Sequence, residues 1–378
     1  MTGRPPASPG LYIHIPFCRT RCGYCDFFSS TDTGIMGDFL RALFQEMALW
    51  HDEFPFFDTV YIGGGTPSLL RPGDMERLLD RVREVFGILP GAEITVEANP
   101  ADWGEDELRE LRSLGVTRIN LGVQSFDDRE LEFLGRRHDS AQARAALSWA
   151  RSAGFDSVGL DLIHSLPGQG FASWRASLEQ ALAFGPEHLS CYELELKADT
   201  PLGLKFGKCE IGGRSEEDLR ELFLRTSELV EGAGYLHYEV SNYAREPGTT
   251  SRHNRKYWDH TPYLGLGPSA HSFRGERRWW NHGSIEGYLG SLRAGEKPVR
   301  GSEDLSADQL AFEALFLGLR MKEGIDLEEY RLRYGVDLLR EKGPQIRDRE
   351  EAGLVRVMSG RLCPTREGMA VADALAVL

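Results

Sequence analysis

Three cysteines near the amino terminus carry the most specific chemical signal in the chain. They are spaced as CxxxCxxC (Cys18, Cys22 and Cys25), directly after an apolar run that we expect to be a β-strand. Thiolates suit iron–sulfur clusters, and short spacing in one loop lets three sulfurs reach three corners of a cube. The fourth iron would then be free to chelate the amino and carboxylate groups of a small molecule. The spacing therefore predicts a four-iron, four-sulfur cluster with one open iron.

Zinc is the alternative, because it also binds cysteine thiolates. A structural zinc site needs a fourth protein ligand at a recognisable spacing, and the nearby His14 lies on the wrong side of a rigid His-Ile-Pro turn. The spacing favours the cluster. Of the other cysteines, we expect Cys191 to pack within a strand and Cys209 to lie in a loop. Six cysteines are too few for a secreted disulfide scaffold in a chain of 378 residues.

Glycines and polar side chains follow several later strand-like runs. The sequence GGGTPS at residues 63–68 closes the second run, where glycines either form a tight turn or bring the backbone close to a ligand. A charged side chain at the carboxyl end of a strand costs desolvation energy unless it meets a ligand or a partner. We expect ligand contacts from the polar residues at such ends, with an internal salt bridge between Glu97 and Arg136 as the alternative. These residues are Glu97, Gln124, Arg136 and Asp161.

The elements that position these residues alternate regularly. Helical patterns separate six β-branched or aromatic runs, which begin at Leu11, Thr59, Glu93, Arg118, Ser157 and His188. Strand–helix alternation indicates parallel strands joined by right-handed crossovers, and six units are fewer than the eight of a closed barrel. We therefore predict an α/β fold, a partial (β/α)6 barrel, with its site at the carboxyl ends of the strands.

The alternation ends near residue 243, and we expect three parts. Residues 1–243 form the barrel, residues 244–300 a loop-rich extension with aromatic residues and histidines, and residues 301–378 a small α+β domain resembling a winged helix. Winged modules often bind nucleic acid, but mixed charge in this one and a net charge of −14 for the chain argue against that partner. We expect the wing to pack or to dock a partner.

Composition sets the broad class. Apolar residues make up 41% and charged residues 27%, which is typical of a globular protein. No run of 18 apolar residues is present, and the first ten residues (MTGRPPASPG) lack the apolar core of a signal peptide. We expect a soluble protein of the cytoplasm.

The cysteine spacing, with the aromatic Tyr24 before the third cysteine, resembles the signature of the radical S-adenosylmethionine (SAM) superfamily. There the cluster passes an electron to SAM and cleaves it to a 5′-deoxyadenosyl radical. The wider string LYIHIPFC from Leu11 is similar to the coproporphyrinogen III oxidase-like branch, a resemblance that covers nearly the whole chain. It implies a [4Fe–4S] cluster on the three cysteines. It also implies SAM contacts at Tyr12, Tyr24, Gly64, Gly65, Thr66, Glu97, Gln124, Arg136 and Asp161.

This branch contains oxidases and HemW haem chaperones, and two features separate them here. Oxidases carry a fourth cysteine two residues after the third and a long amino-terminal arm, whereas this chain has Phe27 at that position and Cys18 near its start. The chaperones are marked by HNxxYW, which matches HNRKYW at residues 253–258. The resemblance thus implies haem as a further ligand and acceptor haemoproteins as partners. Its implied haem contacts are His253, Asn254, Tyr257 and Trp258.

Imidazole is a standard axial ligand of haem iron, and aromatic rings can stack on the macrocycle. His271 and His282 are alternative ligands. In an unrelated chain the same string would be a packed loop, anchored by Tyr257 and Trp258, in which His253 makes a hydrogen bond.

Two functions follow from the resemblance. In the first, the chain carries haem, and its cluster and SAM control dimerisation or release. In the second, it abstracts hydrogen from the propionate chains of coproporphyrinogen III. The missing cysteine favours the carrier, for which we assign no catalytic residue. The resemblance also allows a homodimer and peripheral contact with a membrane.

Overall fold

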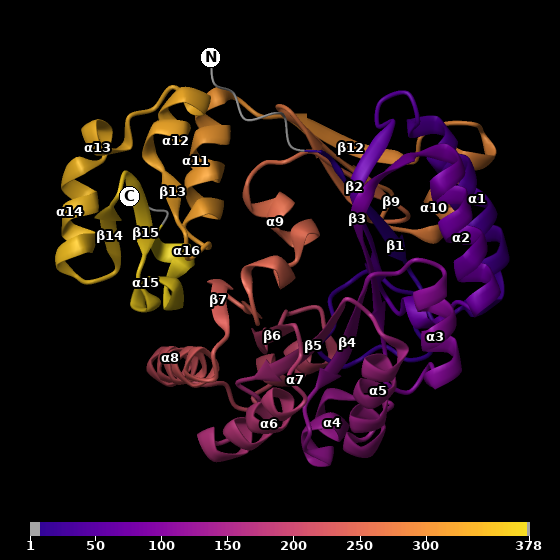
Figure 1. Ribbon diagram of the computed structural model, residues 1–378, viewed down its shortest axis with the longest axis horizontal. Helices are drawn as coiled ribbons and strands as arrows, with labels where there is room; N and C mark the ends of the chain where they lie inside the picture. The colour runs from indigo at the N-terminus through magenta and orange to yellow at the C-terminus, as the bar shows by residue number, and fades with distance from the viewer. Residues whose placement is uncertain (1–7, 376–378) are drawn as a thin grey trace.

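The computed structural model describes residues 8–375. The first seven residues of the MTGRPPASPG segment lie outside this part of the chain. Helices cover the convex side of a large curved sheet, and a small carboxy-terminal domain stands beside it (Figure 1).

Six parallel strands form the centre of a twelve-stranded sheet. Their order across the sheet is their order along the chain, as right-handed crossovers produce. They are β1 (Gly10–Ile15), β2 (Phe56–Gly64), β3 (Gly87–Ala98), β4 (Arg118–Gln124), β5 (Ser157–His164) and β6 (His188–Glu193). The sheet stays open at its two edge strands. The predicted partial α/β barrel is confirmed.

Helices return the chain between these strands because each presents an apolar face to the sheet. One face of α2, for example, buries Met75, Leu78, Leu79 and Val82. The helix α5 begins at a capping box between Asp139 and Gln142, and it ends at Gly154 in the left-handed conformation. The helices are α1 (Met36–Trp50), α2 (Pro72–Val85), α3 (Glu105–Ser113), α4 (Asp128–Leu134), α5 (Ser140–Ala153), α6 (Phe171–Ala183) and α8 (Glu216–Gly232).

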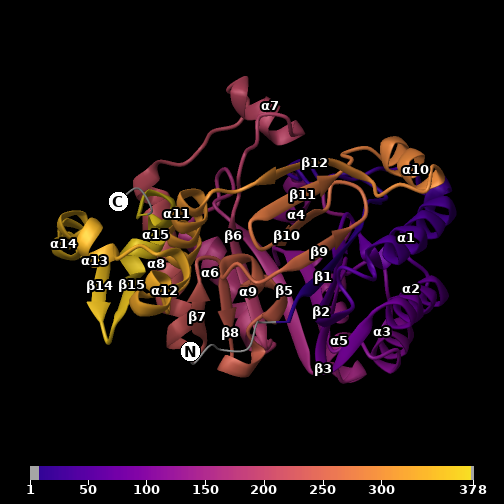
Figure 2. The same ribbon diagram turned by 90° about the horizontal axis from the view of Figure 1, so that it is seen from above.

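Alternation along the strands divides apolar from polar side chains. In β2, Val60 and Ile62 belong to the core, whereas Tyr61 points to the other face of the sheet and donates a hydrogen bond to Glu97. Polar residues therefore gather on the concave face. The short helix α7 (Pro201–Gly207) projects from the body, as Figure 2 shows.

Residues after 235 lengthen the sheet at both edges. On the β6 side lie β7 (Leu236–Glu239) and β8 (Asn242–Ala244), and on the β1 side β9 (Tyr263–Leu266), β10 (His271–Arg274), β11 (Arg277–Asn281) and β12 (Val299–Asp304). The helix α9 (Arg252–Trp258) lies between the sheet and the carboxy-terminal domain, and α10 (Ile285–Arg293) packs on α1 (Figure 1). Residues 244–300, which the sequence pattern predicts to be loop-rich, therefore contain strands. The pattern did not reveal them, because strands of three to six residues give little periodic signal.

The carboxy-terminal domain has its own apolar core. A three-stranded sheet, in the order β13-β15-β14, accompanies its helices. The elements are α11 (Ala307–Gly318), β13 (Ile325–Asp326), α12 (Leu327–Tyr334), α13 (Leu338–Glu341), α14 (Gly343–Glu351), β14 (Val355–Met358), β15 (Arg361–Pro364), α15 (Arg366–Ala370) and α16 (Ala372–Leu375). None of the described helices is long and apolar enough to cross a membrane.

Glu46 of α1 is a fully buried carboxyl group that holds the β9–β12 addition against the barrel. It accepts hydrogen bonds from the hydroxyl of Tyr288 (2.6 Å), the side-chain amide of Asn281 (2.7 Å) and the backbone amide of Gly267 (2.8 Å). Burial raises the pKa of Glu46 to about 7, although the three hydrogen bonds act to lower it.

This raised pKa predicts a pH-dependent contribution to stability. The folded chain holds the proton of Glu46 more tightly than the unfolded chain does, so protonation stabilises the fold. This stabilisation is complete below the ordinary carboxyl pKa of 4.5 and is lost as the pH rises toward 7. We expect the unfolding free energy of the wild type, minus that of Glu46→Gln, to fall by about 2 kcal/mol from roughly pH 5 to pH 7.5. Urea unfolding of both proteins across this range measures the difference. A difference independent of pH would contradict the prediction.

Candidate cofactor site at the carboxyl ends of the strands

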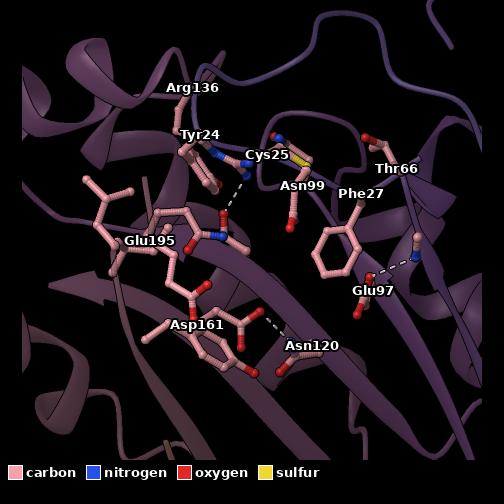
Figure 3. Close-up of a pocket in the computed structure, with 18 of the residues that line it drawn as sticks. Tyr24, Cys25, Phe27, Thr66, Glu97, Asn99, Asn120, Arg136, Asp161 and Glu195 are labelled. Carbon is pink, nitrogen blue, oxygen red and sulfur yellow. Dashed lines mark hydrogen bonds between the residues drawn. The ribbon is translucent and has the colours of Figure 1, made fainter. Parts of the chain in front are cut away.

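A cavity of about 430 Å³ opens where the six parallel strands end (Figure 3). Its volume lies within the range of about 300–1,000 Å³ that is usual for small-molecule sites. Most residues expected at a cofactor site line it. They are Tyr24, Cys25, Gly64, Gly65, Thr66, Glu97, Gln124, Arg136 and Asp161.

The cysteine loop forms one wall of this cavity. Its ends are fixed by three hydrogen bonds. The amide of Cys18 donates to the Ser30 carbonyl, the amide of Ser30 donates to the Pro16 carbonyl, and His14 Nε2 bonds to the Phe28 carbonyl at 2.8 Å. Cys18 is buried, Cys22 and Cys25 are half-buried, and all three are free thiols. The hydroxyl of Thr66 donates to Cys18 Sγ at 3.3 Å, and Arg136 Nη1 donates to Cys22 Sγ at 3.5 Å.

Zinc and a cubic cluster place different demands on the three cysteines. Within residues 8–375, no three side chains of His, Cys, Asp or Glu converge on a point where one metal ion could bind. Zinc holds its sulfur ligands at about 2.3 Å and therefore requires such convergence. A cubic cluster distributes its cysteines over separate irons, which three cysteines of one loop beside a cavity can provide.

Four buried polar atoms in the cavity wall have no hydrogen-bond partner. They are Asn120 Oδ1, Gln124 Oε1, Arg136 Nε and Asp161 Oδ1. Buried polar atoms are nearly always paired, so an unpaired group of four indicates the place of a polar ligand. The residues present thus fit a ligand with several hydrogen-bonding groups.

Asn120 and Asn99 are cavity residues that the motif pattern did not reveal. Asn120 lies on the same face of β4 as Gln124, and its amide donates to Asp161 at 2.7 Å. A polar residue in alternate positions of a buried strand is the signal that could have identified Asn120. Asn99 follows β3 and has no such signal.

Glu97 and Asp161 are buried carboxyl groups on the floor of the cavity. Glu97 accepts from the hydroxyl of Tyr61 (2.7 Å) and the amide of Gly64 (3.3 Å), so the salt bridge with Arg136 considered above is absent. Burial raises the pKa of Glu97 to about 7, and the charge of Asp161 adds to this effect. Burial also raises the pKa of Asp161. Both groups suit hydrogen bonding to ligand hydroxyls.

Tyr12 does not line the cavity. Its hydroxyl bonds to His14 Nδ1 at 3.1 Å, and burial raises its pKa. A side chain cannot be added to Gly64 (φ +108°), because its Cβ would lie 2.6 Å from His14 Nδ1. Tyr12 and His14 therefore support the glycine loop from below, and the contact of Tyr12 with a ligand stays a prediction.

An ion pair with a buried carboxylate and a half-buried arginine joins three loops around the cavity. Asp102, after β3, pairs with Arg137 and accepts a hydrogen bond from the hydroxyl of Ser68 at 2.7 Å. Ser68 lies in the GGGTPS loop and Arg137 directly follows Arg136, so one carboxylate holds the loops that carry Gly64, Thr66 and Arg136. No sequence motif indicated this contact.

The HNRKYW string lies away from the cavity, because α9 closes the concave face toward the amino ends of the strands. The ring of His253 is fully buried, with Nδ1 2.9 Å from Thr59 Oγ1 and Nε2 2.9 Å from the Tyr257 hydroxyl. Burial lowers the pKa of His253 to about 3, so the ring is neutral. The ammonium of Lys256 pairs with Asp58 at 2.8 Å.

This geometry matches the packed-loop alternative for His253, and the haem contact of His253 stays a prediction. Both ring nitrogens lie within hydrogen-bonding distance of other side chains of the protein. The ring takes the role of a packed, hydrogen-bonded residue. Asn254 and Tyr257 line neither the first cavity nor a second one of about 630 Å³ between α9 and the carboxy-terminal domain, whereas Trp258 lines the second.

Comparison with known proteins gives two matching family models, described as "Radical SAM superfamily" over residues 12–181 and "HemN C-terminal domain" over residues 305–371. The chain is 37% identical to "Heme chaperone HemW" of Mycobacterium tuberculosis, over 98% of this chain and 94% of that protein. It is 32% identical to "Heme chaperone HemW" of Bacillus subtilis, over 94% and 95%. Coproporphyrinogen III oxidase (HemN) of Escherichia coli has a similar fold, with a TM-score of 0.84, 23% identity and coverage of 98% and 89%.

The ion pair of Asp102 predicts a loss of stability on its removal. Asp102→Ala leaves Arg137 and Ser68 without their acceptor in a buried setting, and we expect the unfolding free energy to fall by about 2–3 kcal/mol. Asp156→Ala removes the partner of Arg112 in an exposed pair and serves as the control, with an expected loss of about 0.5 kcal/mol. Equal losses in urea unfolding of the two variants would show that the Asp102 pair has no special role.

Proposed function

The chain belongs to the HemW family of radical SAM proteins, and we propose that it is a haem chaperone that binds haem and transfers it to acceptor haemoproteins. The observation that carries this proposal is the alignment with HemW proteins over nearly the whole length of both chains. The likeness to the oxidase supports the fold alone.

We propose that Cys18, Cys22 and Cys25 hold the [4Fe–4S] cluster that the superfamily implies. When bound, the cluster supplies one-electron chemistry and an open iron. SAM would occupy the 430 Å³ cavity, where Asn120, Gln124 and Asp161 offer unpaired polar atoms. Carboxyl groups outnumber cations in its wall, which suits the positive sulfonium of SAM. The carboxyl groups are those of Asp26, Glu97, Asp161, Glu193 and Glu195, and the cations are Arg136 and Lys197.

We propose the second cavity as the haem site. It combines aromatic rings, which suit a flat macrocycle, with arginines, which suit two propionates. The arginines are paired at present, Arg255 with Glu323 and Arg361 with Asp326, so propionates would replace these partners. The lining residues that support the proposal are Arg255, Trp258, His260, Tyr330, Arg333, Tyr334 and Arg361.

His260 is the histidine that we assign to iron. It lines this cavity, and its Nδ1 is 3.0 Å from the Tyr334 hydroxyl while its Nε2 has no hydrogen-bond partner. Ligation would require Nε2 to turn from Glu313, which lies 3.8 Å away. His253 instead fixes α9, and through it Trp258, against the barrel.

Phe27 argues against the oxidase as the alternative function. It stands where the oxidases carry a fourth cysteine, and its ring is exposed at the cavity. We further propose that transfer takes place in the cytoplasm, because the free thiols persist in a reducing compartment. A homodimer and peripheral membrane contact remain predictions, and we assign no role in nucleic-acid binding.

The assignment of the iron ligand predicts opposite results for two histidine variants. We expect His260→Ala to shift the absorption bands of bound haem and His253→Ala to leave them in place. We also expect His253→Ala to lower the unfolding free energy by about 2 kcal/mol, because it removes two buried hydrogen bonds. Anaerobic haem titration followed by absorption spectroscopy measures the bands. A shift in His253→Ala alone would place the ligand at His253 and contradict the assignment.

The haem site predicts that Trp258 contributes to affinity. Loss of one aromatic contact is worth about 1 kcal/mol, so we expect Trp258→Leu to weaken haem binding roughly fivefold. Trp280→Leu, on β11 away from the second cavity, serves as the matched control with unchanged affinity. Equal haem affinities of both variants would exclude the second cavity as the haem site.

The chaperone proposal also predicts that the chain does not act as an oxidase. When the chain with its cluster is incubated with SAM and dithionite, we expect coproporphyrinogen III to remain unconverted, and formation of protoporphyrinogen would establish the oxidase.

A further inference from the structure

Two side chains of the cavity wall direct their polar hydrogens at cysteine sulfurs. Thr66 Oγ1 donates to Cys18 Sγ at 3.3 Å, and Arg136 Nη1 donates to Cys22 Sγ at 3.5 Å. Figure 3 shows Thr66 and Arg136 on either side of Cys25 at one edge of the cavity. Cys25 itself accepts from the backbone amide of Phe27. Each of the three sulfurs therefore has a donor of its own.

The protein fixes Thr66 before any cofactor binds. The amide of Gly65 donates to the Ile15 carbonyl at 2.8 Å, and a Cβ on Gly65 would lie 2.7 Å from the Phe17 carbonyl oxygen. The loop is thus pressed against the residue before Cys18, and a side chain at position 65 would push Thr66 away from the sulfur.

Arg136 is fixed from two sides. Its Nη2 donates to the Gly122 carbonyl at 2.6 Å, and its backbone amide donates to the Leu131 carbonyl at 2.9 Å. The ion pair of Arg137 with the buried Asp102 holds the next residue. One guanidinium nitrogen of Arg136 therefore donates to a backbone carbonyl of β4, and another donates to the sulfur of Cys22.

Hydrogen bonds to the ligating sulfurs are among the factors that set the reduction potential of an iron–sulfur cluster. Reduction adds one electron, so a donor or a positive charge at the sulfurs stabilises the reduced form more than the oxidised form. The charged donor acts more strongly than the hydroxyl, and limited access of water strengthens both.

We propose that Thr66 and Arg136 raise the reduction potential of the cluster by donating hydrogen bonds to Cys18 and Cys22. This inference rests on the proposed cluster and not on haem binding. It gives these two side chains a role toward the cluster, beyond the SAM contacts that the family resemblance implies.

Thr66→Val tests the hydroxyl, because valine has the same shape and no donor. Thr66→Ser retains the donor and serves as the control. The midpoint potential is measured by anaerobic redox titration of the full chain with reconstituted cluster, without SAM or haem, following the electron paramagnetic resonance signal of the reduced cluster. We expect a shift to more negative potential in Thr66→Val and none in Thr66→Ser. An unshifted Thr66→Val, or an equal shift in Thr66→Ser, would overturn the role of Thr66.

Arg136→Gln tests the charge in the same way, with Arg136→Lys as the control that keeps it. We expect a larger negative shift for Arg136→Gln than for Thr66→Val, and a smaller one for Arg136→Lys. An unshifted Arg136→Gln would overturn the role of Arg136. The resonance signal arises only from loaded molecules, so a variant with less cluster still gives its midpoint.

The outcomes separate this inference from the proposed function. If the wild type assembles no cluster, the proposed cofactor and the inference both fail. If the cluster forms and the midpoints do not move, the inference alone fails. If the midpoints move and haem does not bind, the chaperone proposal alone fails.

Discussion

The burial of polar side chains on the concave face of six parallel strands is the constraint on which the rest of the structure depends. Each buried polar group must find a partner, and the two ends of the barrel solve this differently. Toward the amino ends the chain supplies the partners itself, since α9 pairs His253 with Thr59 and Lys256 with Asp58. Toward the carboxyl ends, Gln124 and Asp161 keep unpaired atoms that a ligand can satisfy.

The same division separates the two proposed ligands. We propose SAM and the cluster for the cavity at the carboxyl ends, where the Asp102 pair holds the surrounding loops together. We propose haem for the far side of α9, where Trp258 packs with Tyr238 and Met321 between the barrel and the carboxy-terminal domain. One short helix thus closes the barrel with one face and lines the second cavity with another. A radical-type cofactor site and a carrier site can therefore coexist in one chain without sharing residues.

Local patterns in the sequence predicted much of the fold and of the first cavity. The six strands, the cysteine loop and the polar residues at strand ends follow from short-range spacing, because parallel strands bring their carboxyl ends together. Contacts between distant segments gave no such signal. The Asp102–Arg137 pair and the Glu46 hydrogen bonds join residues far apart in sequence, and the burial of His253 depends on where α9 packs. The short strands β9–β12 form because β1 offers an edge, which periodicity cannot reveal.

Transfer of haem to an acceptor is the step that distinguishes a chaperone from a protein that only binds haem, and the rate of this transfer can be measured. The haem-loaded full chain is mixed under anaerobic conditions with increasing concentrations of an apo-haemoprotein that has a b-type haem site. A chaperone transfers haem within a complex, so we expect a transfer rate that rises with acceptor concentration and exceeds the rate of haem release into buffer. A transfer rate equal to the rate of release and independent of the acceptor would contradict the chaperone proposal, since the chain would then only bind haem.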